Sequence, residues 1–139
     1  MIVLDTNVLS ELMRPAPGER VMRWIASQPA VDLYTSSVTQ AEILHGIMLL
    51  PAGKRRNAFE TAARAMFSQD FQGRIHPFDS DAAHLYAQIA AERHRAGRPI
   101  SQFDAQIAAI ARSVGAALAT RDVADYEGCG VRVINPWKD

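Results

Sequence analysis

The chain has 139 residues, 48% of them hydrophobic, and its formal net charge is +0. This length suits one domain with a sizeable core, and the composition excludes an intrinsically disordered chain. The neutral charge balance excludes an overall basic field, so any contact with nucleic acid must come from local patches. The single cysteine, Cys129, excludes an internal disulfide and a thiolate metal cluster within one chain, as is typical of a protein in a reducing cytosol.

The sequence shows no sign of export or of a membrane span. The first apolar run is broken at Asp5 and has no basic flank before it. No stretch approaches the roughly 18 apolar residues that a membrane-spanning helix requires. We therefore expect a soluble, cytoplasmic protein with no membrane partner.

Short apolar runs alternate with longer segments of helical periodicity along the whole chain. The short runs predict strands, each suited to a buried parallel sheet, at residues 2–5, 32–36, 74–78, 116–120 and 131–134. The longer segments place apolar residues at spacings of three and four and predict helices at residues 19–28, 38–50, 54–69, 81–96 and 102–114.

This alternation predicts an α/β fold, a three-layer sandwich in which helices flank a mainly parallel five-stranded sheet. Segments rich in proline and glycine at 14–18, 51–53 and 97–99 interrupt the pattern, and we expect them to be loops. Nothing divides the chain, so a single domain over residues 1–139 is expected. Thr6 and Asn7, directly after the first strand, are predicted to form a turn.

Four acidic residues lie near the predicted carboxyl ends of the strands, where parallel sheets commonly bind ligands. Asp5 and Asp122 directly follow predicted strands, and Glu42 lies in the first turns of the helix after the second strand. Asp104 lies in the first turn of the helix that leads into the fourth strand. Strand ends and helix starts share one edge of such a sheet, so we expect these four carboxylates in one crevice.

Each acid also has an ordinary structural interpretation. An acid in the first turn of a helix is stabilised by about 0.3 to 1 kcal/mol through the helix dipole, and one after a strand can begin a turn. Glu42, for example, completes the capping box Thr39-x-x-Glu42, although Ser37-x-x-Gln40 is an equally good one. Asp5 is harder to explain this way, because an ionised group at the end of a core strand needs a partner or a cation.

Four carboxylates in one crevice repel one another strongly unless a cation lies among them. Ligation by oxygen alone suits Mg²⁺ or Mn²⁺, and Mg²⁺ keeps several waters while it shares a few carboxylates with a substrate phosphate. Such ions activate water and stabilise an in-line phosphoryl displacement. The pattern therefore points to hydrolysis of phosphodiesters that requires no protein nucleophile.

Several short motifs, in order along nearly the whole chain, together resemble the PIN-domain family. They are Met-Ile-Val-Leu-Asp5-Thr6-Asn7, Ser37-x4-Glu42-x3-Gly46, Asp104-x2-Ile107-Ala108-Ala109 and Thr120-Arg121-Asp122. More narrowly, the chain resembles VapC toxins, especially the FitB-like branch, in its length, in Ile75-His76-Pro77-Phe78-Asp79 and in Asn135-Pro136-Trp137.

The resemblance implies a Mg²⁺- or Mn²⁺-dependent endoribonuclease that cleaves RNA as the toxin of a toxin-antitoxin pair. The catalytic and metal-binding acids that it implies match Asp5, Glu42, Asp104 and Asp122. The accompanying polar positions, which orient ligands or water, match Thr6, Asn7 and Thr120. It further implies a homodimer and a cognate antitoxin whose segment crosses the toxin groove and places a basic side chain in the acidic site.

Other features are less specific. Lys54-Arg55-Arg56 and the group Arg93, Arg95 and Arg98 could contact RNA phosphates, although a run of charges is usually a solvated helix face. Phe103 stands beside Asp104 where the resemblance predicts a smaller residue. Local motifs do not report which RNA is cut, because RNA recognition depends on shape and on splayed bases.

Two alternatives of other classes stay open. A receiver-type phosphoacceptor module has the same size and a parallel sheet, and Asp79 after the third strand with Lys138 after the fifth fits its pattern. That alternative leaves Glu42, Asp104 and Asp122 without a role. The second alternative is a PIN-like domain that binds nucleic acid or a partner and has no catalytic activity.

Overall fold

The computed structural model describes residues 1–139 and contains a five-stranded sheet in which all neighbouring strands are parallel. The strands are β1 (Ile2–Leu4), β2 (Leu33–Ser36), β3 (Ile75–His76), β4 (Ala117–Ala119) and β5 (Val133–Ile134). Their spatial order is β3-β2-β1-β4-β5, which puts β1 at the centre. The predicted sheet is confirmed, with every strand shorter than expected.

Six α-helices connect and flank the strands. They are α1 (Thr6–Leu12), α2 (Glu19–Ser27), α3 (Ser37–Met48), α4 (Lys54–Ala65), α5 (Ser80–Arg95) and α6 (Gln102–Ser113). A π-helical turn, η2 (Met66–Asp70), continues α4, and two 3-10 turns are η1 (Ala30–Asp32) and η3 (Val123–Tyr126). The five predicted helices are confirmed, whereas α1 was not expected.

The predicted turn at Thr6 and Asn7 is wrong, because α1 begins directly at the end of β1. Asp5 is the N-cap of this helix, and its carboxylate accepts a hydrogen bond from the Thr6 backbone N–H at 2.8 Å. An aspartate at this position supplies the acceptor that the first turn of a helix lacks. The short helix then buries Val8 and Leu9.

Helices cover both faces of the sheet. The side chains of Ile2 and Leu4 join one buried cluster, and Val3 between them joins the other. This alternation is the period of two that a strand buried on both faces requires. The first cluster includes residues of α1, α3 and α4, and the second is built mainly from α5, α6 and Tyr126. The predicted three-layer sandwich is thus confirmed.

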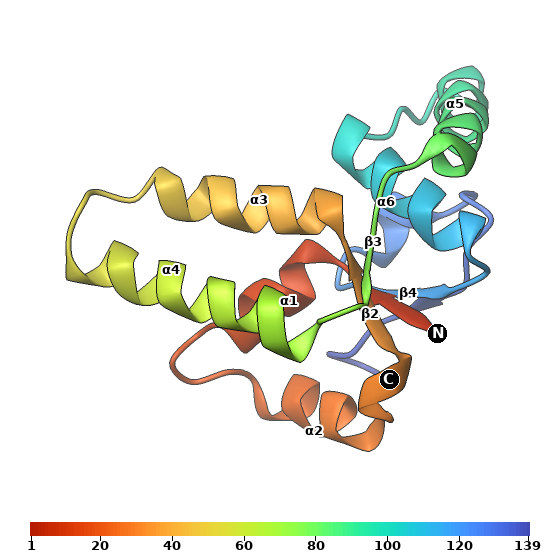
Figure 1. Cartoon of the computed structure of the whole chain (residues 1–139). Coiled ribbons are helices and arrows are strands. Elements are labelled where there is room, and N and C mark those ends of the chain that lie inside the picture. The colour runs from red at the N-terminus through yellow and green to blue at the C-terminus, as the bar shows by residue number, and fades with distance from the viewer.

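Figure 1 shows α3 and α4 as an antiparallel hairpin that projects away from the sheet, while α5 lies beside α6. Ile43 and Ile47 of α3 belong to the same buried cluster as Ala63 of α4, which anchors the hairpin near the sheet. The first turns of α3 consequently remain at the sheet edge, where β2 ends.

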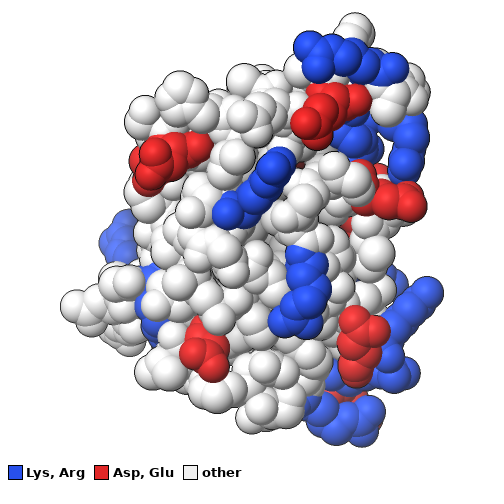
Figure 2. Space-filling model, turned by 90° about the vertical axis from the view of Figure 1, so that its right-hand side faces the viewer, with Lys and Arg blue, Asp and Glu red and all other residues white.

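The surface carries both signs of charge. On the face drawn in Figure 2, acidic and basic side chains are interspersed, and no broad area of one sign covers it. This distribution agrees with the formal net charge of +0. None of the helices has the length and apolar character needed to cross a membrane.

Candidate active site

All four predicted acids meet at one hollow. This hollow, about 570 Å³ in volume, lies at the carboxyl edge of the sheet and is lined by Asp5, Glu42, Asp104 and Asp122 together with polar neighbours. The acids come from the end of β1, the second turn of α3, the start of α6 and the segment after β4. The parallel arrangement brings these distant parts of the sequence to one place.

Asp5 is the most deeply buried of the four, with only 4% of its surface exposed. Its backbone N–H extends the pairing of β1 with β4 by donating to the Ala119 carbonyl at 2.9 Å. The Thr120 hydroxyl donates to its carboxylate at 2.7 Å. Burial, reinforced by the charge of Asp104, raises the pKa of Asp5 to about 6, although the hydrogen bonds from Thr120 and Thr6 oppose the rise.

Two further acids have donors from the first turn of α1. The Thr6 hydroxyl donates to Glu42 Oε1 at 2.8 Å, and the Asn7 amide donates to Asp122 Oδ2 at 3.1 Å. The Asn7 carbonyl oxygen accepts from the Arg121 backbone N–H at 3.2 Å, which ties the segment after β4 to α1. The unexpected helix α1 therefore places both orienting side chains.

Glu42 is not a helix cap. The N-cap of α3 is Ser36, whose hydroxyl accepts from the Thr39 backbone N–H at 3.1 Å. Neither capping box expected near this point begins the helix, because the chain enters the helical conformation at Ser37. The Glu42 carboxylate is thereby left to face the Thr6 hydroxyl in the hollow.

The Asp104 carboxylate likewise does not cap its helix. Ser101 is the N-cap of α6 and accepts from the Asp104 backbone N–H at 3.2 Å, so the helix start was predicted well. The Asp104 carboxylate does not turn back to cap the helix. Its Oδ1 accepts from the Tyr126 hydroxyl at 3.0 Å instead.

Tyr126, which the sequence did not single out, is the remaining polar group at the acids. Its hydroxyl lies 3.2 Å from Asp5 Oδ2 as well as 3.0 Å from Asp104 Oδ1. Burial and the two neighbouring negative charges raise the pKa of Tyr126 far above its usual range, so the phenol keeps its proton. A tyrosine four residues after Asp122 carries no recognisable motif, and only the path of η3 brings it here.

The donor set fits a hard divalent cation. Carboxylate, hydroxyl and amide oxygens surround the hollow, and none of the four acids pairs with a lysine or arginine. No three acidic side chains converge at direct ligand distances. This arrangement suits Mg²⁺, which is usually held by one or two carboxylates and several waters.

Basic side chains stand at the rim of the hollow. Arg14 and Arg121 both line it, Arg14 paired with Glu11 at 2.9 Å and Arg121 with its guanidinium 5.1 Å from the centre of the Trp137 ring. Arg55 lines a neighbouring hollow that shares Thr6, Ser10 and Glu42 with the first. Phe103 is 52% exposed and does not line the acidic hollow.

The prediction that Arg93 contacts RNA phosphates is wrong. This residue is 8% exposed, and its guanidinium donates to backbone carbonyls inside the protein. Arg98 is on the surface, where it pairs with Glu127 at 3.0 Å. The sequence does not distinguish the buried arginine from the exposed basic residues beside it at the end of the helix.

The receiver alternative is also wrong. In the flavodoxin-like order 2-1-3-4-5, which receivers share, the third strand lies beside the first. Here β3 lies beside β2, at the edge of the sheet. Asp79, the candidate phosphoacceptor, is the N-cap of α5 and accepts from the Ala82 backbone N–H at 3.0 Å.

Comparison with known proteins agrees with this fold and site. The PIN domain pattern matches residues 2–124, and the chain belongs to the PIN-domain family. Within that family it belongs to the VapC-type toxins, in the branch that includes FitB. It is 42% identical to VapC ribonuclease Y4jK of Sinorhizobium fredii over 138 residues, 99% of either chain.

A second relative, toxin FitB of Neisseria gonorrhoeae, is 42% identical over 139 residues and covers 100% of both chains. The crystal structure of FitAcB from the same organism superposes with a TM-score of 0.93 at 41% identity and 100% coverage of both chains. The similarity therefore extends over the sheet, the helical hairpin and the acidic hollow together.

Proposed function

We propose that this chain is a divalent-metal-dependent endoribonuclease that serves as the toxin of a toxin-antitoxin pair. One observation carries the proposal: four carboxylates from distant parts of the sequence line one hollow and none has a basic partner. Relatives named a VapC ribonuclease and a toxin, each matched over at least 99% of this chain, support the same function.

Mg²⁺ or Mn²⁺ is the proposed cofactor. Asp5, Glu42 and Asp104 would hold the principal ion, directly or through its waters, and Asp122 would complete the site through a water or a second, substrate-assisted ion. Such an ion activates water as the nucleophile and offsets the negative charge that develops on the phosphate oxygens. The raised pKa of Asp5 fits this role, since a cation would stabilise the ionised carboxylate that burial disfavours.

The hydroxyl and amide donors keep the acids in place. Thr6, Asn7 and Thr120 each direct a hydrogen bond at a different carboxylate, namely those of Glu42, Asp122 and Asp5. Donors of this kind set the orientation of metal ligands and are worth about 10- to 100-fold in affinity or activity.

The RNA strand would approach over the rim of the hollow. Arg14 and Arg121, which line the hollow, would contact phosphates of the strand, and Arg55 lines the adjoining hollow. Phosphate contacts position a strand without reading its sequence. A few local arginines suffice for this, which is consistent with a protein of zero net charge.

The same acidic hollow would attract a basic side chain of a cognate antitoxin by electrostatic complementarity. Blocking the hollow would stop catalysis, because the acids and the rim arginines would be covered together.

We further propose that the chain forms a homodimer, which light scattering of the purified protein tests directly.

The decisive experiment compares RNA cleavage by the purified chain with Mg²⁺, with Mn²⁺ and with excess chelator. Cleavage should require the metal and should be lost in Asp104→Asn, while Asp125→Asn, an exposed aspartate nearby, should keep full activity. Cleavage that persists in chelator would overturn the metal mechanism. RNA binding without turnover under every metal condition would favour the non-catalytic alternative.

A further inference from the structure

The Tyr126 hydroxyl is the only hydrogen-bond partner of the Asp104 carboxylate in the structure. Its oxygen lies 3.0 Å from Asp104 Oδ1 and 3.2 Å from Asp5 Oδ2, within donating distance of both carboxylates. Asp5 has additional donors in Thr6 and Thr120, whereas Asp104 has none. The second carboxylate oxygen of Asp104 is left without a protein partner, on a side chain that lines the hollow.

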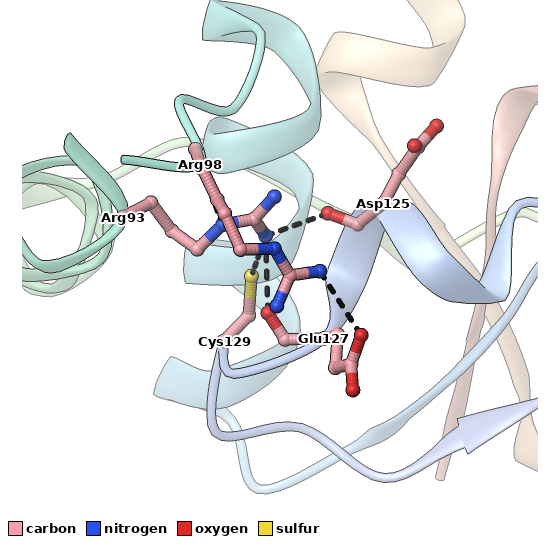
Figure 3. A network of polar contacts seen from close by, with 5 residues as sticks. All are labelled: Arg93, Arg98, Asp125, Glu127 and Cys129. Atoms are coloured by element: carbon pink, nitrogen blue, oxygen red, sulfur yellow. Dashed lines mark hydrogen bonds and ion pairs between the residues drawn. The ribbon is translucent and has the colours of Figure 1, made fainter. Parts of the chain in front are cut away.

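Tyr126 is held from outside the acidic hollow by a buried arginine. Arg93, in the last turn of α5, donates through Nη1 to the carbonyls of Asp125 at 2.8 Å and Glu127 at 3.1 Å, the two residues that flank Tyr126. Its Nε donates to the Arg98 carbonyl at 2.8 Å. Figure 3 shows the Arg93 guanidinium reaching from α5 to the backbone carbonyls of Asp125 and Glu127.

The acceptors of Arg93 reveal what it does. All three oxygens belong to the backbone, and its remaining contact is Cys129 Sγ at 3.5 Å, so no carboxylate neutralises the buried cation. A buried charge is costly unless its donors are satisfied. Here they are satisfied by the Arg98 carbonyl after α5 and by the carbonyls of Asp125 and Glu127 on either side of Tyr126. What the guanidinium fixes is therefore the path of the main chain through Tyr126.

We propose that Tyr126 is a positioning residue of the metal site and that Arg93 holds it in register with Asp5 and Asp104. The hydroxyl keeps one oxygen of each carboxylate turned inward, which leaves the free oxygen of Asp104 for the ion. The proposal rests on the proposed function in naming a divalent cation as the ligand. The contacts that carry it are those of the protein alone.

The first test measures Mn²⁺ binding to the purified chain by calorimetry, without RNA. Tyr126→Phe keeps the buried ring and removes only the hydroxyl, and it should weaken Mn²⁺ binding about 10- to 100-fold, as the loss of an outer partner of a ligand does. Tyr86→Phe is the matched control, because the Tyr86 ring packs edge-on against Phe78 and its hydroxyl makes no hydrogen bond. It should bind Mn²⁺ like the wild type.

The second test asks whether Arg93 acts through Tyr126. Arg93→Gln should weaken Mn²⁺ binding, and Arg93→Lys, which can replace some of the donors, should recover part of the loss. In the Tyr126→Phe background the Arg93→Gln change should have little further effect on Mn²⁺ affinity, because the hydroxyl is already gone. Arg98→Gln removes the exposed ion pair with Glu127 and should leave Mn²⁺ affinity unchanged.

The outcomes separate this inference from the proposed function. If the wild type binds Mn²⁺ and Asp104→Asn does not, the metal site stands, and equal affinity in Tyr126→Phe overturns the positioning role alone. If the wild type does not bind Mn²⁺, both proposals are overturned. Fully additive losses for Arg93→Gln and Tyr126→Phe would show that Arg93 acts by another route, and if Arg93→Gln fails to fold, Arg93→Lys decides that step.

Discussion

Two buried charges contact the region of Tyr126, Asp5 at its hydroxyl and Arg93 at the backbone of its neighbours, and neither has an ion-pair partner. Asp5 accepts hydrogen bonds from hydroxyl and backbone donors, and Arg93 donates to backbone carbonyls. Asp5 borders an open hollow shared with three more acids, whereas Arg93 is enclosed by its acceptors. Their surroundings differ in one respect: those of Asp5 leave room for a charged ligand.

This difference distinguishes a ligand-binding residue, Asp5, from a structural residue, Arg93. The pKa of Asp5 is raised to about 6 because its hydrogen bonds do not offset the cost of burial and the charge of Asp104. That deficit is what a divalent cation would remove. At Arg93 the backbone carbonyls accept hydrogen bonds from the buried cation, so the cost of burying this charge is offset without a ligand.

The largest expected effect is on catalysis. Asp5→Asn removes the buried negative charge and should lower RNA cleavage at least about a hundredfold, as the loss of one preorganised electrostatic group does. In chelator, the same variant should unfold at a higher urea concentration than the wild type at pH 7, because an uncompensated charge is gone. Cleavage rates and urea unfolding measure the two effects. Unchanged cleavage would remove Asp5 from the catalytic set.

The next effect is on stability. Arg93→Met leaves the carbonyls of Arg98, Asp125 and Glu127 without their donor, and each buried acceptor left unpaired costs about 1 to 3 kcal/mol. We expect a loss of about 3 kcal/mol or more in the free energy of unfolding, measured in urea. Arg98→Met breaks only an exposed pair and should cost less than about 1 kcal/mol. Equal losses in the two variants would contradict the enclosed role of Arg93.

A third effect is the pH dependence of the metal-free protein. The pKa of Asp5 is higher in the folded protein, about 6, than its ordinary value of 3.8, so between these values the native state holds more protons than the unfolded state. Stability from this group therefore falls as pH rises from about 4 to 6, by at most about 3 kcal/mol, and is level outside that window.

Urea unfolding of the wild type and Asp5→Asn in chelator, at several pH values, isolates this contribution, since other acids titrate in both proteins. The difference between the two should grow across the window in favour of the variant. A constant difference would show that Asp5 is not deprived of a countercharge. Saturating Mg²⁺ or Mn²⁺ should abolish the fall in the wild type, because binding of the ion favours the ionised acid.

The smallest effect is on RNA affinity. Arg121→Gln should weaken RNA binding in chelator by a few fold and should lower the slope of log affinity against log salt by about 0.7, the loss of one phosphate contact on a single strand. Filter binding at several salt concentrations measures both. Arg23→Gln, an exposed arginine of α2 away from the hollow, should change neither. Identical salt slopes for the two variants would remove Arg121 from the RNA path.

Much of the candidate site could be predicted because its acids carry local signals. Asp5 and Asp122 follow apolar runs, and Glu42 and Asp104 sit in first or second helical turns, so a parallel sheet alone brings them to one edge. The helix α1 was missed because Thr6 and Asn7 are weak helix formers, and the capping carboxylate of Asp5 with the burial of Val8 and Leu9 outweighs that preference.

Tyr126 and Arg93 could not be predicted as part of the site. Tyr126 belongs to a short 3-10 turn with no periodicity, and Arg93 stands among basic residues that otherwise face solvent. Their roles depend on contacts between residues more than twenty positions apart, such as Tyr126 with Asp104 and Arg93 with the Asp125 carbonyl. No local pattern encodes which of several arginines is enclosed when helices pack.

The sequence by itself determined the alternation of strands and helices, the parallel sheet and the four acids, because hydrophobic periodicity and strand ends are local properties. Tertiary structure alone decided which donor serves which acid, which arginine is buried and that a tyrosine joins Asp5 to Asp104. The physical reason is that burial sets the strength of charges and hydrogen bonds, and burial exists only once the layers have packed.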